Sequence, residues 1–441
     1  MTALPISWTS VRLGVAITLN YGKALPEHSR TGAGFPVYGS NGVVGRHTQP
    51  LTSGPTIIIG RKGSVGAVQF SSIPCSPIDT TYFITQTPGG QLRYWYYLLS
   101  SLELSSLNKS TAIPGLSRED AYRIEVSIAP LNEQKRIADK LDTVLTRVDA
   151  VNDRLARVAP LLKRFRQSVL AAATSGRLTE DWRLSVTSQN AADDLQRNLE
   201  LRVKSEKKAP APPDMTHWKK VIPPTWAVAS VHQFAECLDR LRVPIKRDAR
   251  KSELRLYPYY GANGEVGRID EYIFDSELVL VTEDETFYGR EKPIAYRSSG
   301  KCWVNNHAHV LRAPSKEASD YLCYSLMYYD VIPWLSGTTG RAKLTQQALN
   351  SLPIAVPPSQ EITEIVRRVE TLFAFADRLE TRLQAARTAA NRLTPALLAK
   401  AFRGELVPQD PNDEQAAELL KRLASNVPTS PKRRGRPAKA A

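Results

Sequence analysis

The chain has 441 residues, 42% hydrophobic and 23% charged, and this length with ordinary globular composition predicts two or three domains. Its formal net charge of +15 favours an acidic polymer as partner, and nucleic acid is the best match. No apolar run has the length of a membrane span, the first residues lack a secretory leader, and the four cysteines have no paired metal-binding spacing. We therefore expect a cytoplasmic protein with reduced thiols and no membrane partner.

Residues 1–130 are expected to form a first globular domain, a small α+β unit. Short apolar runs between glycines, asparagines and prolines predict strands at 56–60, 66–70 and 80–84. An apolar and aromatic segment at 93–104 predicts a helix.

Turns and loops of this domain carry the candidate DNA contacts. An Asn-Gly pair predicts a tight strand connection, and GRKGSVG at 60–66 is a basic glycine-rich loop without the ending of a nucleotide-binding loop. The polar segment LNKSTAIPGLS at 107–117 adds hydroxyls and a cation. Such groups suit phosphates or a guanine edge, although each segment could equally be an ordinary solvated loop. The candidates are Tyr38, Ser40, Asn41, Arg46, Arg61, Lys62, Lys109, Ser110 and Thr111.

Residues 131–178 are expected to form a long helix. Apolar residues alternate steps of four and three over 33 residues, which predicts a coiled-coil seam roughly 50 Å long. Pro160 should kink this helix or divide it into two segments. The seam begins Ile137, Leu141, Val144, Val148, Val151 and Leu155.

A polar linker at 179–217, with one exposed helix, precedes a second globular domain at 218–357. The second domain repeats the first at several points: YGSNGVVGR at 38–46 returns as YGANGEVGR at 260–268. A strand is predicted at 277–281 and a helix at 321–329.

The second domain differs from the first where its chemistry matters. VTEDETFYGR at 281–290 places an acidic loop where the first domain has its basic one, so its DNA contacts cannot be copied from there. His307 and His309 should share one face of a strand as ordinary polar contacts without a carboxylate cluster, so no metal site is expected. The candidate DNA contacts are Tyr260, Asn263, Arg268, Arg290, Lys301, Thr338, Arg341 and Lys343.

A second long helix is expected at 358–406, with each seam position 228 residues after its counterpart in the first. Two seams of equal length most simply pack against each other, although each could pack only on its own domain. Pro395 again predicts a kink or a division. The seam includes Ile365, Val369, Leu372, Leu379 and Leu383.

Residues 407–441 predict a short amphipathic helix and a basic tail. The tail sequence KRRGRPAK resembles an AT-hook, in which Arg434 and Arg436 would enter a narrow minor groove. Alternatively, the tail only adds nonspecific affinity.

The motifs of DNA-modifying enzymes do not appear in the sequence. An Asn/Asp-Pro-Pro-aromatic methyltransferase motif does not occur, and Glu206 and Lys208, which have a nuclease-like spacing, lie in the polar linker. We therefore predict no catalytic residues and no bound metal.

The segments PLNEQKRIADKLD at 130–142, AAATSGRLTEDWR at 171–183 and AFRGELVPQDPNDE at 401–414 resemble the specificity subunit of type I restriction–modification systems. The resemblance extends from Leu4 to about Leu423. It implies two tandem target-recognition domains separated by two long helices, which form an antiparallel coiled coil with a pseudo-twofold internal repeat.

The same resemblance implies the function. Each domain would read one half of a bipartite, asymmetric site on double-stranded DNA from the major groove, and the helices would fix the unread spacer. The helix regions would dock two methyltransferase (modification) subunits, and restriction–translocation subunits would join them. The partners, rather than this chain, would bind S-adenosylmethionine, ATP and magnesium. Two alternatives remain: a stand-alone methyltransferase or nuclease, and a coiled-coil DNA scaffold without sequence preference.

Overall fold

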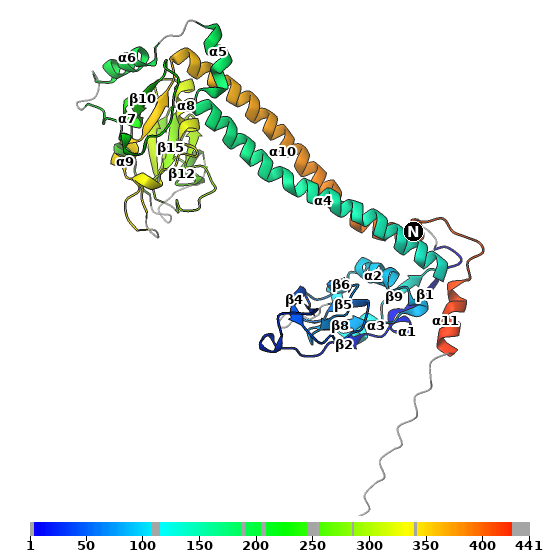
Figure 1. The fold of residues 1–441 in the computed structure, drawn as a ribbon. Helices are drawn as coiled ribbons and strands as arrows, with labels where there is room; N and C mark the ends of the chain where they lie inside the picture. The colour runs from blue at the N-terminus through cyan, green and yellow to red at the C-terminus, as the bar shows by residue number, and fades with distance from the viewer. Residues whose placement is uncertain are drawn as a thin grey trace, which may run out of the picture. The chain divides into compact units, whose positions relative to one another are not determined.

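The computed structural model describes residues 4–107, 115–186, 190–203, 209–245, 254, 256–284, 286–338 and 342–425. The chain folds into two compact units (Figure 1). Unit 1 comprises residues 1–156 and 384–441, and unit 2 comprises residues 157–383. Two long helices, α4 (Leu131–Thr174) and α10 (Ser359–Phe402), each contribute residues to both units. Within the described residues, no helix has the combination of length and apolar character that crossing a membrane requires.

The described residues of unit 1 form three small sheets. Their orders are β2-β8-β5-β6, β4-β3-β7 and β1-β9, and all pairs are antiparallel except β3 with β7. The predicted strand at 66–70 begins only at Val68, because Gly66 adopts a φ of +77° in the preceding turn. The strands are β1 (Thr9–Arg12), β2 (Asn20–Tyr21), β3 (Phe35–Gly39), β4 (Gly42–His47), β5 (Thr56–Gly60), β6 (Val68–Ser71), β7 (Ser76–Pro77), β8 (Thr81–Ile84) and β9 (Glu125–Ile128).

The core of unit 1 lies between its sheets and its helices. Ile57 and Ile59 of β5 and Trp95 and Leu99 of α2 belong to one fully buried cluster. Helix α2 ends three residues before the predicted position, because Leu102 adopts an extended backbone conformation. The helical segments are α1 (Leu13–Ala16), η1 (Glu27–Ser29), η2 (Pro88–Gly90), α2 (Leu92–Ser101), η3 (Leu104–Leu107), α3 (Arg118–Tyr122) and α11 (Ala416–Ser425).

Unit 2 repeats these sheets with one added strand. Their orders are β11-β18-β15-β16, β13-β12-β17-β14 and β10-β19, and the pair β12 with β17 is parallel, as β3 with β7 is in unit 1. The strands are β10 (Ala227–Ser230), β11 (Glu236–Cys237), β12 (Tyr257–Gly261), β13 (Gly264–Ile269), β14 (Phe274–Asp275), β15 (Leu278–Thr282), β16 (Ala295–Ser298), β17 (Lys301–Val304), β18 (Ala308–Arg312) and β19 (Pro353–Val356).

Helices complete unit 2. Helix α8 begins five residues before the predicted helix, where the Ser315 side chain accepts a hydrogen bond from the Ala318 backbone, and ends at Leu326, three residues before the predicted end. The segment predicted as a polar linker with one exposed helix contains two α-helices among its described residues, α5 and α6, together with the 3-10 turn η5. The helical segments are η4 (Arg177–Thr179), α5 (Glu180–Ser185), α6 (Ala191–Val203), η5 (Met215–His217), α7 (Val231–Phe234), η6 (Asp239–Leu241), α8 (Lys316–Leu326), η8 (Ile332–Trp334) and α9 (Gln346–Ser351).

The duplication extends to local irregularities of the strands. The β3–β4 hairpin has a register shift between Val37 and Tyr38, and the β12–β13 hairpin has one between Tyr259 and Tyr260. A β-bulge at the same place in both hairpins bends both in the same way. The fold is therefore α+β with a repeated domain, as the sequence echo predicts.

The long helices pair in antiparallel fashion inside each unit. In unit 1, Ile137 and Leu141 near the start of α4 share a core cluster with Leu398 and Ala401 near the end of α10. In unit 2, the end of α4 shares a cluster with the start of α10 (Figure 1): Val169, Leu170 and Ala173 with Ile362, Ile365 and Val369. Each unit is thus completed by a helix segment that is distant in sequence.

Each long helix continues through its proline, so of the two outcomes predicted for the prolines, a kink or a division, the division is wrong. Pro160 and Pro395 both lie at exposed positions. There, water can bind the carbonyl that loses its helical partner.

The seam is buried unevenly. Ile137, Leu141, Val148, Ile365, Val369 and Leu383 are buried, and Val144, Leu155, Leu372 and Leu379 are half-buried. Val151 is 44% exposed, so the predicted stripe does not bury every member.

Candidate nucleic-acid interface

In unit 1, the predicted Asn-Gly turn lies beside the basic loop. Ser40 and Asn41 connect β3 to β4, and Gln69 Nε2 of β6 donates a hydrogen bond to Ser40 O (3.2 Å). A Cβ atom at Gly63, in the basic loop, would lie 3.2 Å from Ser40 Oγ. Tyr38 is half-buried in β3, just before the turn. Four predicted contact residues, the turn pair together with the Arg-Lys pair of the loop, therefore come from neighbouring segments.

Arg61 is held in place by its surroundings, whereas Lys62 is exposed. The Arg61 side chain donates to Asp79 O (2.9 Å), and its guanidinium lies 5.0 Å from the ring centre of Tyr21 and 5.9 Å from that of Tyr82. Burial, together with the hydrogen bond to Tyr21, raises the pKa of Tyr82 to about 12. Lys62 is thus the better placed of the two cations to contact a ligand.

In unit 2, a side chain of the same domain hydrogen-bonds to the equivalent turn. Arg290 Nη2 donates to Asn263 Oδ1 (2.6 Å) and to Pro293 O (3.0 Å). The Tyr260 ring lies 5.9 Å from the Tyr296 ring. Arg290 therefore supports the shape of the turn, a role that sequence reasoning did not assign to it.

Three predicted residues lie away from these turns. Arg46 is paired with Pro36, and Arg268 with Pro258, at the opposite end of each hairpin. Arg46 donates to Gly34 O (2.8 Å), and Arg268 lies 3.2 Å from Glu265. Lys301 begins β17, with its amine 4.5 Å from the ring centre of Tyr272.

Other predicted contacts lie outside the described residues: Lys109, Ser110, Thr111, Arg341, Arg434 and Arg436. Thr338 is described and exposed.

Next to the turn of unit 2 lies a polar cavity of 680 Å³. Asn263, Asp284, His307 and Lys343 contribute to its walls. The His307 ring nitrogen Nδ1 lies 2.8 and 3.0 Å from the two carboxylate oxygens of Asp284. Hydrogen-bond donors and acceptors therefore line the same cavity.

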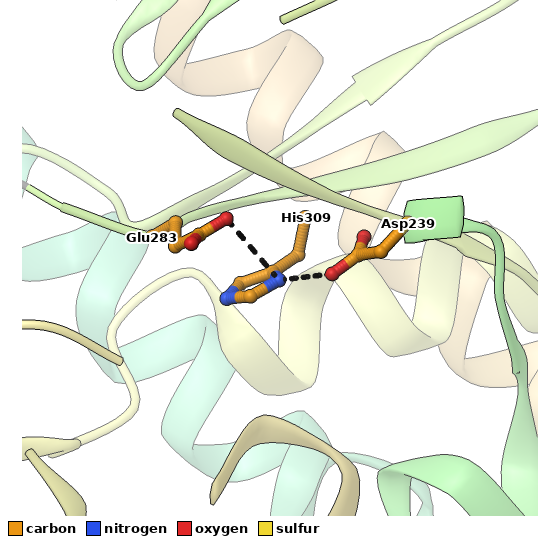
Figure 2. A group of neighbouring side chains, drawn as sticks. All are labelled: Asp239, Glu283 and His309. Atoms are coloured by element: carbon orange, nitrogen blue, oxygen red, sulfur yellow. Dashed lines mark hydrogen bonds and ion pairs between the residues drawn. The ribbon is translucent and has the colours of Figure 1, made fainter. Parts of the chain in front are cut away.

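Behind this cavity, Asp239, Glu283 and His309 point toward one another (Figure 2). His309 Nδ1 lies 2.5 Å from Asp239 Oδ2 and 3.8 Å from Glu283 Oε2, and its Nε2 lies 2.8 Å from Leu344 O. Both ring nitrogens of His309 therefore have an oxygen partner within hydrogen-bonding distance. All three side chains are buried.

This cluster corrects the prediction made for the two histidines. His307 precedes β18 and is half exposed, whereas His309 lies inside β18 and is fully buried, so they do not share a face. Each histidine also has a carboxylate partner. The three ligand atoms of Asp239, Glu283 and His309 lie within 4.8 Å of one another, a spacing that could suit a metal ion.

Cations already occupy those ligand atoms. Arg242 Nη1 lies 2.5 Å from Glu283 Oε2, and Lys343 Nζ lies 2.7 Å from Glu283 Oε1. Burial alone would raise the pKa of Asp239, but His309 and Arg242 lower it; in the same way, Lys343 and Arg242 lower the pKa of Glu283 against the effect of burial. The cluster is therefore an ion-pair network, and its residues do not fit a metal site. Lys343, a predicted DNA contact, is bound into this network.

Strand register shows which residues of the two units are equivalent. Ile59 pairs with Tyr82 in unit 1, and Val281 pairs with His309 in unit 2. Ile59 of β5 is therefore equivalent to Val281 of β15. Two residues further along the chain, unit 1 has Arg61 and unit 2 has Glu283.

The loop that closes each site supports this assignment. Leu116 N donates to Arg61 O (2.8 Å), and Leu344 N donates to Glu283 O (2.9 Å). The following residues, Lys62 and Asp284, each form an isolated bridge to the residue before that leucine. Lys62 and Asp284 therefore occupy equivalent positions.

A second repeated feature joins each globular domain to a long helix. In unit 1, Trp8 Nε1 donates to Glu133 Oε2 (3.0 Å) near the start of α4, and Gln409 Nε2 donates to Glu133 Oε1 (2.6 Å). Burial raises the pKa of Glu133, although both hydrogen bonds lower it. Arg136 is ion-paired with Asp413 at 2.6 Å.

Unit 2 has the same arrangement near the start of α10. Trp226 Nε1 donates to Glu361 Oε2 (2.8 Å), and Thr179 Oγ1 donates to Glu361 Oε1 (2.6 Å). Arg183 is also ion-paired with Glu361, which is fully buried. We call these two arrangements the tryptophan–glutamate clamps. Sequence reasoning missed them, although both glutamates lie near the starts of the two predicted long helices.

Glycines allow the chain to pass close to each clamp. Gly404 has a φ of +77°, and a Cβ there would lie 2.4 Å from Pro5. Gly176 has a φ of +78°, and a Cβ there would lie 2.5 Å from Pro223. Only glycine fits both the conformation and the space. In each unit, the segment that follows one long helix thus packs on the domain joined to the other long helix.

Comparisons with known proteins match both copies of the repeat. A family model described as the type I restriction modification DNA specificity domain matches residues 5–159 and 223–386. The EcoDI type I restriction enzyme specificity subunit of Escherichia coli is 27% identical over 95% of this chain and 95% of its own length. The EcoKI specificity subunit of Escherichia coli K12 is 29% identical over 73% of this chain and 68% of its own length.

Solved structures support the fold. A chain from a structural study of assembly and conformational transition in the type I restriction–modification system has a TM-score of 0.60 at 14% identity, covering 92% of this chain and 100% of that one. The HsdS subunit of Thermoanaerobacter tengcongensis has a TM-score of 0.51 at 17% identity, covering 91% and 98%.

Proposed function

Because the chain belongs to the type I restriction modification DNA specificity family, we propose that it is the noncatalytic subunit that chooses the DNA sequence for a type I complex. Each unit reads one half of a bipartite, asymmetric site on double-stranded DNA. The formal net charge of +15 supports a polyanionic partner and predicts binding that weakens with salt.

One observation carries this proposal: the fold is repeated in the two units, but the residues that follow the equivalent strands β5 and β15 differ. Both hairpins have the same bulge and both units the same central strand order. Equivalent positions nevertheless hold Lys62 in one unit and Asp284 in the other. Similar docking with dissimilar side chains suits two different half-sites, because base edges are distinguished by their donors and acceptors.

We propose that α4 and α10 act as a ruler between the two readers. Both helices contribute residues to both units, and both continue through 44 residues. A stiff spacer between two binding modules converts a fixed length into a preferred gap between half-sites.

The clamps are the proposed docking regions for partners. Beside the unit 1 clamp, Ile6 is 95% exposed, and near the unit 2 clamp, Val221 is 90% and Leu184 87% exposed. Exposed apolar side chains beside two copies of one feature suit two copies of one partner. We assign them to two methyltransferase subunits, with restriction–translocation subunits joining the assembly in the cytoplasm. S-adenosylmethionine, ATP and magnesium belong to those partners.

Methylation mapping in cells with and without this chain tests the proposal. We expect a methylated motif of two short parts, separated by unread bases, that disappears when the chain is removed. A motif that persists unchanged, or one without a second part, would refute it.

Two further measurements address the alternatives. Titration of the isolated chain with S-adenosylmethionine should give no binding heat, whereas a stand-alone methyltransferase would bind it. Footprints on unrelated duplexes should differ in position with sequence, whereas a nonspecific scaffold would protect every sequence alike.

A further inference from the structure

The equivalent reading positions of the two units have opposite hydrogen-bonding character. Lys62 follows β5 and can only donate, whereas Asp284 follows β15 and, when ionised, can only accept. The preceding residues also have opposite charge. The Arg61 guanidinium lies over the rings of Tyr21 and Tyr82. The Glu283 carboxylate lies beside His309, which also contacts Asp239.

Asp284 has the setting of a ligand-binding carboxylate. Its side chain is 35% exposed in the wall of the 680 Å³ cavity, beside the hairpin turn. His307 holds both of its oxygens from one side, at 2.8 and 3.0 Å. Each carboxylate oxygen keeps a further lone pair for a second donor.

A cationic residue lies next to this carboxylate. Lys343 forms an isolated β-bridge with Asp284 and lines the same cavity. Lys343 and Arg242 also pair with Glu283 in the network behind it. These cations offset part of the repulsion between Asp284 and a phosphate.

Chemistry limits what Asp284 can read. In the major groove, guanine presents only acceptors and thymine presents an acceptor and a methyl group, so a carboxylate would repel both. Cytosine presents an amino donor, and adenine presents an amino donor beside an acceptor. Cytosine is the better match, because it has no acceptor in the major groove.

We propose that Asp284, held by His307, is a specificity-determining residue of unit 2 that accepts a hydrogen bond from an exocyclic amino group, cytosine N4 in preference to adenine N6. Lys62 occupies the equivalent position in unit 1 and donates to guanine acceptors. The assignment rests on the proposed function, since it requires that each unit reads its own half-site.

The test is methylation mapping with the chain produced together with its methyltransferase partners. The Asp284→Asn variant, whose amide also donates, should lower the preference for the amino base by about tenfold at one position of one half-site. The other half-site should be unchanged. The Asp284→Glu variant should retain the amino-base preference, and Glu271→Gln, which removes an exposed charge elsewhere in unit 2, should leave the whole motif unchanged.

The Lys62→Gln variant should relax a guanine position in the other half-site. A two-part motif that Asp284→Asn leaves intact would overturn the inference while the proposed function stands. The same holds if Asp284→Asn and Lys62→Gln alter the same half. A motif that never had two parts would instead refute the proposed function.

Discussion

Lengthening both long helices by one seam repeat should lengthen the preferred gap between the half-sites. The insertion points are between Ala156 and Arg157 in α4 and between Leu383 and Gln384 in α10, where the chain passes from one unit to the other. Seven residues preserve the seam and add about 10.5 Å to each helix, at about 1.5 Å per residue. That length corresponds to about 3 base pairs, at about 3.4 Å each.

Rotation limits the gain. About 3 base pairs turn the second half-site by about 100° around the duplex axis, because a full turn takes about 10.5 base pairs. The seven-residue repeat rotates the helix by only about 20°. We therefore expect a gap one to three base pairs longer, together with weaker binding.

Methylation mapping with the doubly extended chain measures the gap directly. An insertion in α4 alone is the control, because it leaves the two seams unequal and should abolish recognition of the two-part site. If the double insertion left the gap unchanged, the helices would not be setting it, and the ruler would be refuted.

Three other perturbations test the clamps, the buried network and the electrostatics. Glu361→Gln should destabilise unit 2 by about 3–5 kcal/mol in chemical denaturation, because it removes the fully buried carboxylate that pairs with the partly buried guanidinium of Arg183. Glu370→Gln, at an exposed position of α10, should change stability little, and equal effects would argue against the clamp. The folded-state pKa of Asp239 is lowered, so its contribution to stability is present above its unfolded pKa and is lost as pH falls below about 4. Asp239→Asn should make the free energy of unfolding depend less on pH in this range, measured by denaturation at a series of pH values. An unchanged pH dependence would exclude the network as its source. Because Lys62 is proposed to contact a guanine edge, Lys62→Gln should alter the base preference and leave the slope of log affinity against log salt unchanged. A slope reduced by about 0.9 would instead show that the amine contacts a phosphate.

Local sequence patterns predict much of the fold. The four-and-three spacing from Ile137 predicts a long helix with one apolar stripe, because side chains at that spacing share a face. Asn41-Gly42 predicts a tight hairpin, because glycine readily adopts positive φ. Repetition of YGSNGVVGR, in turn, predicts a second copy of the domain. Each of these inferences depends only on residues that are neighbours in the chain or on comparison of two segments.

Tertiary structure decided which distant residues meet. Asp239, Glu283 and His309 come from separate elements, and only the β11-β18-β15 pairing brings them together. Alternation predicted one face for the two histidines, but β18 begins at Ala308 and so leaves His307 outside the strand. Periodicity does not show where a strand begins.

Sequence by itself determined that this chain contains two related domains and two long helices with apolar seams. It did not determine that unit 1 is completed by residues 384–425, or that Gln409 and Glu133 form one clamp. Lys62 and Asp284 are separated by 222 residues, as Tyr38 and Tyr260 are, but only the hydrogen-bonded register shows that they occupy equivalent places in the two sheets. An apolar stripe specifies that a face must be buried, whereas the partner that buries it depends on packing of the whole unit.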